Sequence, residues 1–147
     1  MAKLLYGSGL RLMECLCLRV KDVDVAQTQV VVRDGKGGKD RVTVLPETLV
    51  PFLQEHLQHV EYLHDDDLRR GYGKIPLPDA LARKYPHASR EWIWQYVFPA
   101  SQRRPHPRTG EIVRDHIQGF QTRHPPCRYQ EARHAPRLPP LLRHAPA

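Results

Sequence analysis

The chain has 147 residues and carries 23 Lys and Arg against 16 Asp and Glu, a formal net charge of +7. This length suits one ordinary domain and is too short for two. The mean hydropathy of −0.59, with no apolar run near the ~20 residues that cross a bilayer, argues against an integral membrane protein. Met1 to Gly9 lack a secretory signal pattern, so we expect a cytoplasmic protein. The excess positive charge favours a polyanionic partner.

Two amphipathic helices and a β-hairpin are predicted in the first half. Apolar residues at helical spacing predict a helix from Leu4 to Val23. Strands are predicted at Thr28 to Val32 and Arg41 to Leu45, joined by the basic, glycine-rich turn Asp34 to Asp40. A second helix is expected from Pro46 to about Asp67. The buried positions expected for the two helices are Leu12, Cys15, Leu16 and Val20, then Leu49, Phe52, Leu53, Leu57, Val60 and Leu63.

Prolines interrupt the second half, where short helices are expected at Pro78 to Lys84 and Ser89 to Gln95. Tyr96 to Phe98 predicts a short strand, and Ser101 to Glu111 predicts an exposed turn. Residues 122–147 alternate Pro and Arg and hold few core-forming residues, so a disordered tail is expected there. These features predict a mixed α/β (α+β) fold with a small antiparallel sheet.

Two motifs in the first half resemble those of a known family. Leu4 to Asp24, which contains Gly7-Ser8-Gly9-Leu10-Arg11-Leu12-Met13-Glu14-Cys15-Leu16, resembles the first catalytic box of the tyrosine site-specific recombinases. Gly35 to Pro46 resembles the lysine-bearing hairpin of that family. The two motifs also have the family's order and spacing.

The middle of the chain narrows the resemblance to the integron integrases. Leu77 to Pro86 and Trp92 to Ala100 are similar to the extra segment that distinguishes these enzymes. The resemblance implies that 1–121 form a partial recombinase catalytic domain, that 71–100 form its integron-type helical insert, and that 122–147 lie outside it.

The family's chemistry explains why an arginine is expected in the first box. Strand exchange moves a phosphodiester to a tyrosine and back through a phosphorus with extra negative charge, which fixed cationic donors stabilise. A guanidinium is planar, always protonated and able to hold two phosphate oxygens. The resemblance assigns this catalytic role to Arg11, with Glu14 at i+3 as its supporting residue. An exposed helical ion pair is the alternative for these two residues.

The remaining site residues come from the hairpin and the insert. Lys36 matches the general-acid lysine that protonates the leaving 5′ oxygen, with Lys39 as its nearest rival. Lys39 and Arg41 are expected to bind DNA, although a solvated basic turn explains the same residues. Trp92 and Trp94 either stack on extruded bases or pack within the insert.

A histidine cluster raises a competing idea. His56, His59 and His64, followed by the run Asp65-Asp66-Asp67, could suggest a divalent metal site. A solvated polar face explains the same residues, and neither a cysteine partner nor an H-x3-H pair supports a metal. We expect no metal and no cofactor.

Three elements of the family pattern are missing, one of them a further His or Trp. The H-x-x-R box and the nucleophilic tyrosine are not present in context, and His87 to Arg90 and His134 to Arg137 match the box by letter alone. A G/C-rich back-translation of Cys127 to Pro146, read one nucleotide later, contains a His-x-x-Arg-His string. This predicts a frame slip between about Phe120 and Arg123, and a chain that is inactive alone.

The resemblance implies a DNA partner and no membrane. The parent reaction would be site-specific recombination at cassette recombination sites through a 3′-phosphotyrosine, by a tetramer on DNA. The alternative is a non-catalytic basic module that binds nucleic acid, or a functionless remnant. Competition between a folded single-stranded cassette site and random DNA separates these possibilities.

Overall fold

The computed structural model describes residues 1–33, 39–77, 79–106 and 110–117, and the hairpin tip with Lys36 and the tail 122–147 lie outside these ranges. The helices are α1 (Ala2–Ser8), α2 (Leu12–Leu16), α3 (Val50–Arg69) and α4 (Asp79–Lys84), with 3-10 turns η1 (Val20–Asp22), η2 (Glu47–Leu49), η3 (Ala88–Arg90) and η4 (Trp92–Trp94). The strands are β1 (Val23–Asp24), β2 (Gln29–Val32), β3 (Arg41–Val44), β4 (Arg104–Pro105) and β5 (Ile112–Val113). They confirm the mixed helix and antiparallel sheet.

The long N-terminal helix predicted for 4–23 is wrong, because the chain breaks at Gly9. Gly9 takes the left-handed conformation with φ 60°, and its N–H donates to the Leu5 carbonyl. Glycine adopts this conformation without a Cβ penalty, so it commonly ends a helix in this way. Helix α2 then starts on a new axis, which leaves Leu12 exposed while Cys15 is fully buried.

The predicted β-hairpin is confirmed. Strands β2 and β3 pair antiparallel, with Val30 opposite Thr43, and β1 adds a third strand to β2. Alternation turns Val30 and Val32 inward, where both are buried. The first core contains Leu4, Leu10, Cys15, Leu18, Val30, Val32, Leu45, Leu53, Val97 and Phe98.

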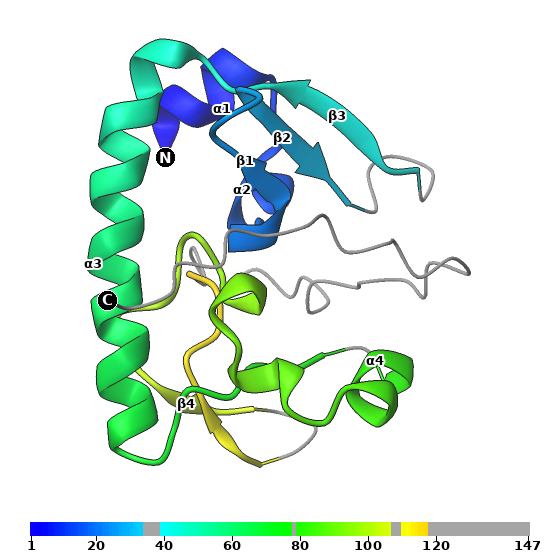
Figure 1. Cartoon of the computed structure of the whole chain (residues 1–147), viewed down its shortest axis with the longest axis vertical. Helices are drawn as coiled ribbons and strands as arrows, with labels where there is room; N and C mark the ends of the chain where they lie inside the picture. The colour runs from blue at the N-terminus through cyan, green and yellow to red at the C-terminus, as the bar shows by residue number, and fades with distance from the viewer. Residues whose placement is uncertain (34–38, 78, 107–109, 118–147) are drawn as a thin grey trace, which may run out of the picture.

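The predicted second helix is confirmed as η2 and α3, with one misplaced side chain. Helix α3 runs alongside the whole described chain, with α1, α2 and the sheet beside its first half and the insert beside its second half (Figure 1). Leu53 and Val60 are buried as expected, but Phe52 is 62% exposed. Its ring lies at the surface, where the Lys3 Nζ sits 5.0 Å from the ring centroid.

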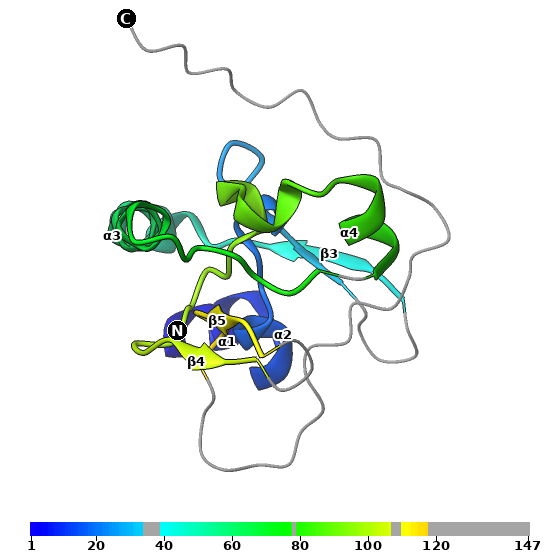
Figure 2. The ribbon, with the colours of Figure 1, turned by 90° about the horizontal axis from the view of Figure 1, so that it is seen from below.

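Residues 71–100, the segment expected to be an insert and called the insert below, contain a small separate core of Ile75, Leu77, Ala88 and Trp94. The two predicted short helices are present as α4 and as η3 with η4. The strand expected at 96–98 is replaced by a single bridge between Arg19 and Tyr96. Within the turn expected at 101–111, Arg104 and Pro105 form β4, which pairs with β5. In Figure 2 this strand pair and α4 lie on opposite sides of the described chain.

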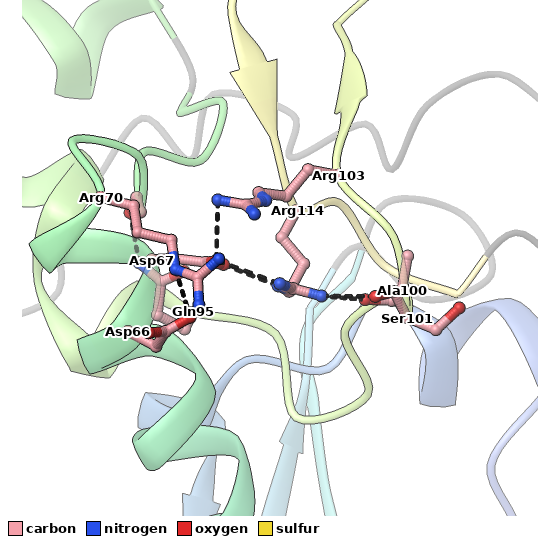
Figure 3. Close-up of polar contacts among 9 residues, drawn as sticks. Asp66, Asp67, Arg70, Gln95, Ala100, Ser101, Arg103 and Arg114 are labelled. Carbon is pink, nitrogen blue, oxygen red and sulfur yellow. Dashed lines mark hydrogen bonds and ion pairs between the residues drawn. The ribbon is translucent and has the colours of Figure 1, made fainter.

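A buried ion pair joins Asp67, near the end of α3, to Arg114, the residue that follows β5 (Figure 3). The Asp67 carboxylate is 2% exposed and accepts hydrogen bonds from Arg114 Nε at 2.6 Å and Nη2 at 3.0 Å. Arg114 also donates to the carbonyls of Ala100 and Ser101, and Arg103 lies 3.6 Å from Asp67. Each oxygen of the buried carboxylate thus accepts a hydrogen bond from Arg114, which holds the segment after β5 against α3.

Among the described residues, no helix is both long and apolar enough to cross a membrane.

Candidate functional site

Arg11 stands at the start of α2, directly after the Gly9 break. It is the N-cap residue, with extended backbone angles of −73° and 155°. Its backbone N–H donates to Glu14 Oε2 at 2.8 Å, and its Nη1 donates to Glu14 Oε1 at 2.8 Å. The Arg11 side chain is 59% exposed, so its guanidinium is held on one side and open to solvent on the other.

Glu14 is the centre of the cluster, because it also binds Arg41. Arg41 Nη2 donates to Glu14 Oε2 at 2.7 Å, and the Glu14 side chain is only 8% exposed. Burial alone would raise the pKa of the Glu14 carboxyl, but the Arg11 hydrogen bonds and the Arg41 charge outweigh burial and lower this pKa. Glu14 is therefore a carboxylate at neutral pH, and the Arg11–Glu14–Arg41 cluster carries a net charge of +1.

Close packing between α1 and the hairpin brings Arg41 to this cluster. Thr43 Oγ1 donates to the Ser8 carbonyl at 2.7 Å, and Arg41 Nη2 lies 3.3 Å from the Gly9 carbonyl. A Cβ on Gly7 would lie 2.6 Å from Pro46 Cγ. The glycine at this position thus allows the backbone of α1 to lie close to Pro46, at the end of the hairpin.

The two candidate lysines of the hairpin, Lys36 and Lys39, precede Arg41 in the sequence. Lys39 is exposed beside β3, and Lys36 lies outside the described residues. Where the two strands meet the turn, Arg33 Nε donates to Asp22 at 3.0 Å and Arg33 Nη1 donates to Asp40 at 3.1 Å. Asp22 is 3% exposed, so Arg33 is held on one side by a buried carboxylate.

The structure places the two tryptophans within the insert. Trp94 is 7% exposed and belongs to the insert core, with Lys21 Nζ 4.3 Å from its ring centroid. Trp92 is half-buried, with its ring 6.1 Å from that of His64. The low exposure of Trp94 favours core packing over base stacking for this residue.

Arg19 joins the insert to the first core, a role that sequence patterns missed. Its buried guanidinium donates to the Trp94 carbonyl at 2.7 Å and to the Pro76 carbonyl at 3.3 Å, and it lies 4.7 Å from the Tyr96 ring centroid. Next to it, burial lowers the pKa of Lys21 although Asp22 lies 3.5 Å away. The Arg19 partners are 57 or more residues away, so helical or strand spacing cannot indicate them.

The histidines of α3 make structural hydrogen bonds. His56 Nε2 lies 2.8 Å from the Val97 carbonyl, and His64 Nε2 lies 2.9 Å from the Arg90 carbonyl. His64 is 6% exposed, which corrects the expectation that these residues form a solvated face. Each of the two imidazoles ties α3 to the second half of the chain. No group of three or more potential metal ligands is found within the described residues.

Comparisons with known proteins identify the family. The chain matches the model of the phage integrase family over residues 1–117, which contain the Arg11–Glu14–Arg41 cluster and the whole of the segment 71–100. The chain belongs to this family. It is also 42% identical to an "Integrase/recombinase" of Escherichia coli, over 98% of this chain and 43% of that protein.

Two further relatives support the same family. An "Integrase/recombinase" of Pseudomonas aeruginosa is 42% identical over 98% of this chain and 43% of that protein. A "Tyrosine recombinase XerA" of Thermococcus kodakarensis is 42% identical over 49% of this chain and 27% of that protein. The chain thus spans less than half the length of the relatives that it matches.

Proposed function

We propose that this chain is a DNA-binding fragment of an integron integrase, corresponding to the first part of its catalytic domain. The observation that carries the proposal is the Arg11–Glu14–Arg41 cluster within the segment that matches the family. Two guanidiniums share one buried carboxylate there, and both keep an exposed side. Oriented guanidiniums with free N–H groups suit the oxygens of a phosphodiester.

We assign one role in the parent enzyme to each residue of the site. Arg11 holds the scissile phosphate, and Glu14 positions Arg11. Arg41 and Lys39 contact neighbouring phosphates, and Lys36 is the general acid of the parent enzyme. The parent reaction is site-specific DNA recombination at cassette sites through a 3′-phosphotyrosine, by a tetramer on DNA. Trp92 is the remaining aromatic candidate for contact with an extruded base.

Competition binding tests the DNA role. The chain, labelled with a fluorophore, is mixed with a folded single-stranded cassette site and competed with random DNA of equal length. A fragment with family function prefers the folded site, whereas a generic basic module shows no preference and loses affinity steeply with salt. An absence of preference would favour the generic module.

Matched variants locate the contact. Arg11→Ala and Arg41→Ala should each weaken binding and reduce the slope of log affinity against log salt by about 1, as expected for one lost phosphate contact. Arg69→Ala removes the same charge from an exposed position on α3 and is the control. If all three variants behave alike, net charge and not the cluster drives binding.

Catalysis is tested separately. We propose that the chain alone does not cleave DNA, because the H-x-x-R box and the nucleophilic tyrosine are not found in context in its sequence. A covalent protein–DNA adduct formed by the purified chain on a suicide recombination site would contradict this.

The frame slip is decided by the coding DNA. The family match ends at residue 117, ahead of the proposed slip, whereas the alignment with the E. coli relative covers 98% of the chain and continues past it. A shifted reading that does not yield the His-x-x-Arg-His string would refute the slip.

A further inference from the structure

An acidic residue interrupts the basic run of the hairpin. Asp40 lies between Lys39 and Arg41, the two residues to which phosphate contacts are assigned above. A carboxylate beside two phosphate-binding cations repels the phosphates and weakens their attraction to the site. The Asp40 side chain is 46% exposed, so it does not serve the hydrophobic core. Its partner within the hairpin indicates a different role.

That partner is Arg33, on the opposite strand of the hairpin. Val32 lies opposite Arg41 in the register of β2 and β3, and the same register continued by one residue places Arg33 opposite Asp40. Arg33 Nη1 donates to Asp40 Oδ2 at 3.1 Å. Opposite charges at directly opposed positions stabilise an antiparallel strand pair. The ion pair therefore holds the two strands together where they meet the turn.

Arg33 is in turn anchored to η1. Its Nε donates to Asp22 Oδ1 at 3.0 Å, and Asp22 is 3% exposed. Lys21 Nζ lies 3.5 Å from the same oxygen and 4.3 Å from the Trp94 ring centroid. Removing a partner from a buried carboxylate is strongly unfavourable, so Asp22 keeps Arg33 in one place. The contacts thus run from the insert through Asp22 and Arg33 to Asp40.

The start of β3 is held by contacts on both of its faces. Successive side chains of an extended strand point to opposite faces. Glu14 binds Arg41 at 2.7 Å, and Arg33 binds the preceding residue, Asp40, at 3.1 Å. A contact on one face alone allows the end of the strand to tilt away from it, whereas contacts on both faces fix its position. The exposed Lys39 follows directly from this fixed point.

We propose that Arg33 and Asp40 are positioning residues for DNA binding. Their ion pair fixes the chain at 39–41, so that the Lys39 ammonium and the Arg41 guanidinium meet neighbouring phosphates in a defined arrangement. Groups that are already ordered before binding lose less conformational entropy when the partner binds. The inference rests on the proposed function, because it concerns how the same DNA-binding site is arranged.

Asp40→Asn tests the proposal by the direction of its effect. The variant raises the formal net charge from +7 to +8, so an interaction driven by charge alone should become tighter. If Asp40 positions the cations, binding instead weakens roughly threefold to tenfold, and the slope of log affinity against log salt falls by up to about 1. Fluorescence anisotropy of the full chain with the folded single-stranded cassette site, over a series of salt concentrations, measures both quantities.

Two control variants accompany this measurement. Asp40→Glu keeps the carboxylate and should bind DNA within about twofold of the wild type. Asp65→Asn removes the same charge from an exposed position on α3, and should leave binding unchanged or make it tighter. Circular dichroism checks that each variant is as folded as the wild type, so that a difference in affinity reports on the site.

A double-mutant cycle isolates the ion pair. Arg33→Gln should weaken binding, partly through the loss of its own charge. On the Arg33→Gln background, Asp40→Asn should no longer weaken binding, because the partner of the carboxylate is already gone. A general loss of stability would instead weaken binding on both backgrounds.

Either of two results would overturn the proposal. One is that Asp40→Asn binds DNA as tightly as the wild type or more tightly. The other is that it weakens binding equally with and without Arg33. Both results leave the DNA-binding proposal standing, because the wild type is measured in the same series. If the wild-type chain bound no DNA, the proposed function would fail, and the positioning role would fail with it.

Discussion

Replacing Glu14 by glutamine is the most direct test of how the site is held together. The carboxylate accepts hydrogen bonds from the Arg11 backbone, the Arg11 guanidinium and the Arg41 guanidinium. Glutamine keeps the shape but removes the charge, and it turns one acceptor into an NH2 group that faces a donor. The site therefore loses two ion pairs and at least one hydrogen bond.

The loss of stability caused by this substitution depends on how exposed the two arginines are to solvent. Hydrogen bonds to charged groups contribute roughly 1.5–3 kcal/mol each, whereas exposed ion pairs contribute about 0.2–1 kcal/mol. Arg11 is 59% exposed and Arg41 is 37% exposed, so both pairs are partly screened by solvent. We expect Glu14→Gln to lower the free energy of unfolding by about 2 kcal/mol. For a chain of this length that corresponds to a fall in Tm of roughly 4–8 °C.

The lowered pKa of Glu14 also predicts in which direction the effect of this substitution changes with pH. Because the pKa of Glu14 lies below its ordinary value of 4.5, its stabilisation is present above that value and is lost as pH falls through the lowered pKa. The stability difference between the wild type and Glu14→Gln should therefore shrink in acid. Urea unfolding followed by circular dichroism, near neutrality and at acid pH, measures this difference.

A control variant separates the cluster from general charge effects. Glu55→Gln removes the same charge from an exposed position on α3 and should change stability little. The reasoning is refuted if the two variants are equally stable, or if the Glu14→Gln difference does not shrink in acid.

Three further variants test other parts of the structure. Asp67→Asn leaves Arg114 without its buried carboxylate, and should cost about 3–5 kcal/mol in urea unfolding; a loss typical of surface pairs would contradict the burial. Gly7→Ala places a Cβ 2.6 Å from Pro46 Cγ, and should lower Tm through a cost of about 1–3 kcal/mol; an unchanged Tm would refute the close approach. Arg19→Leu removes the donor to two insert carbonyls, and should cost roughly 2–3 kcal/mol and shift tryptophan fluorescence, since both tryptophans lie in the insert. Unchanged fluorescence would show that the insert is held without Arg19.

Local sequence signals predicted the elements well wherever neighbours along the chain determine the structure. The β-branched residues of β2, the polar and apolar alternation of β3 and the helical spacing after Pro46 each led to the observed element. The Arg11–Glu14 contact was also expected from the i,i+3 spacing, although Arg11 is the extended N-cap residue of α2 and the pair forms a capping box. The Gly9 break was missed because the apolar period continues through the glycine, although glycine favours the left-handed backbone that ends α1.

Contacts between distant segments could not be predicted from spacing. Arg41 reaches Glu14 from 27 residues away, and Arg114 reaches Asp67 from 47 residues away. Phe52 had the correct helical spacing but is 62% exposed, with Lys3 Nζ 5.0 Å from its ring centroid. The aromatic residues of the insert left core packing and base stacking equally open, and only the burial of Trp94 distinguishes them.

Helix α3 makes the two halves of this chain mechanically dependent on each other. At about 1.5 Å per residue, its 20 residues form a rod of roughly 30 Å. Leu53 near one end packs in the first core, whereas His64 and Asp67 near the other end are bonded to the insert and to β5. If the helix rotates as a rigid body, the contacts at both of its ends change together. A displacement of the insert would therefore be transmitted through α3 to the first core, which contains residues of the sheet that carries Arg41. Amide protection at the two ends of α3 should then be lost in one step.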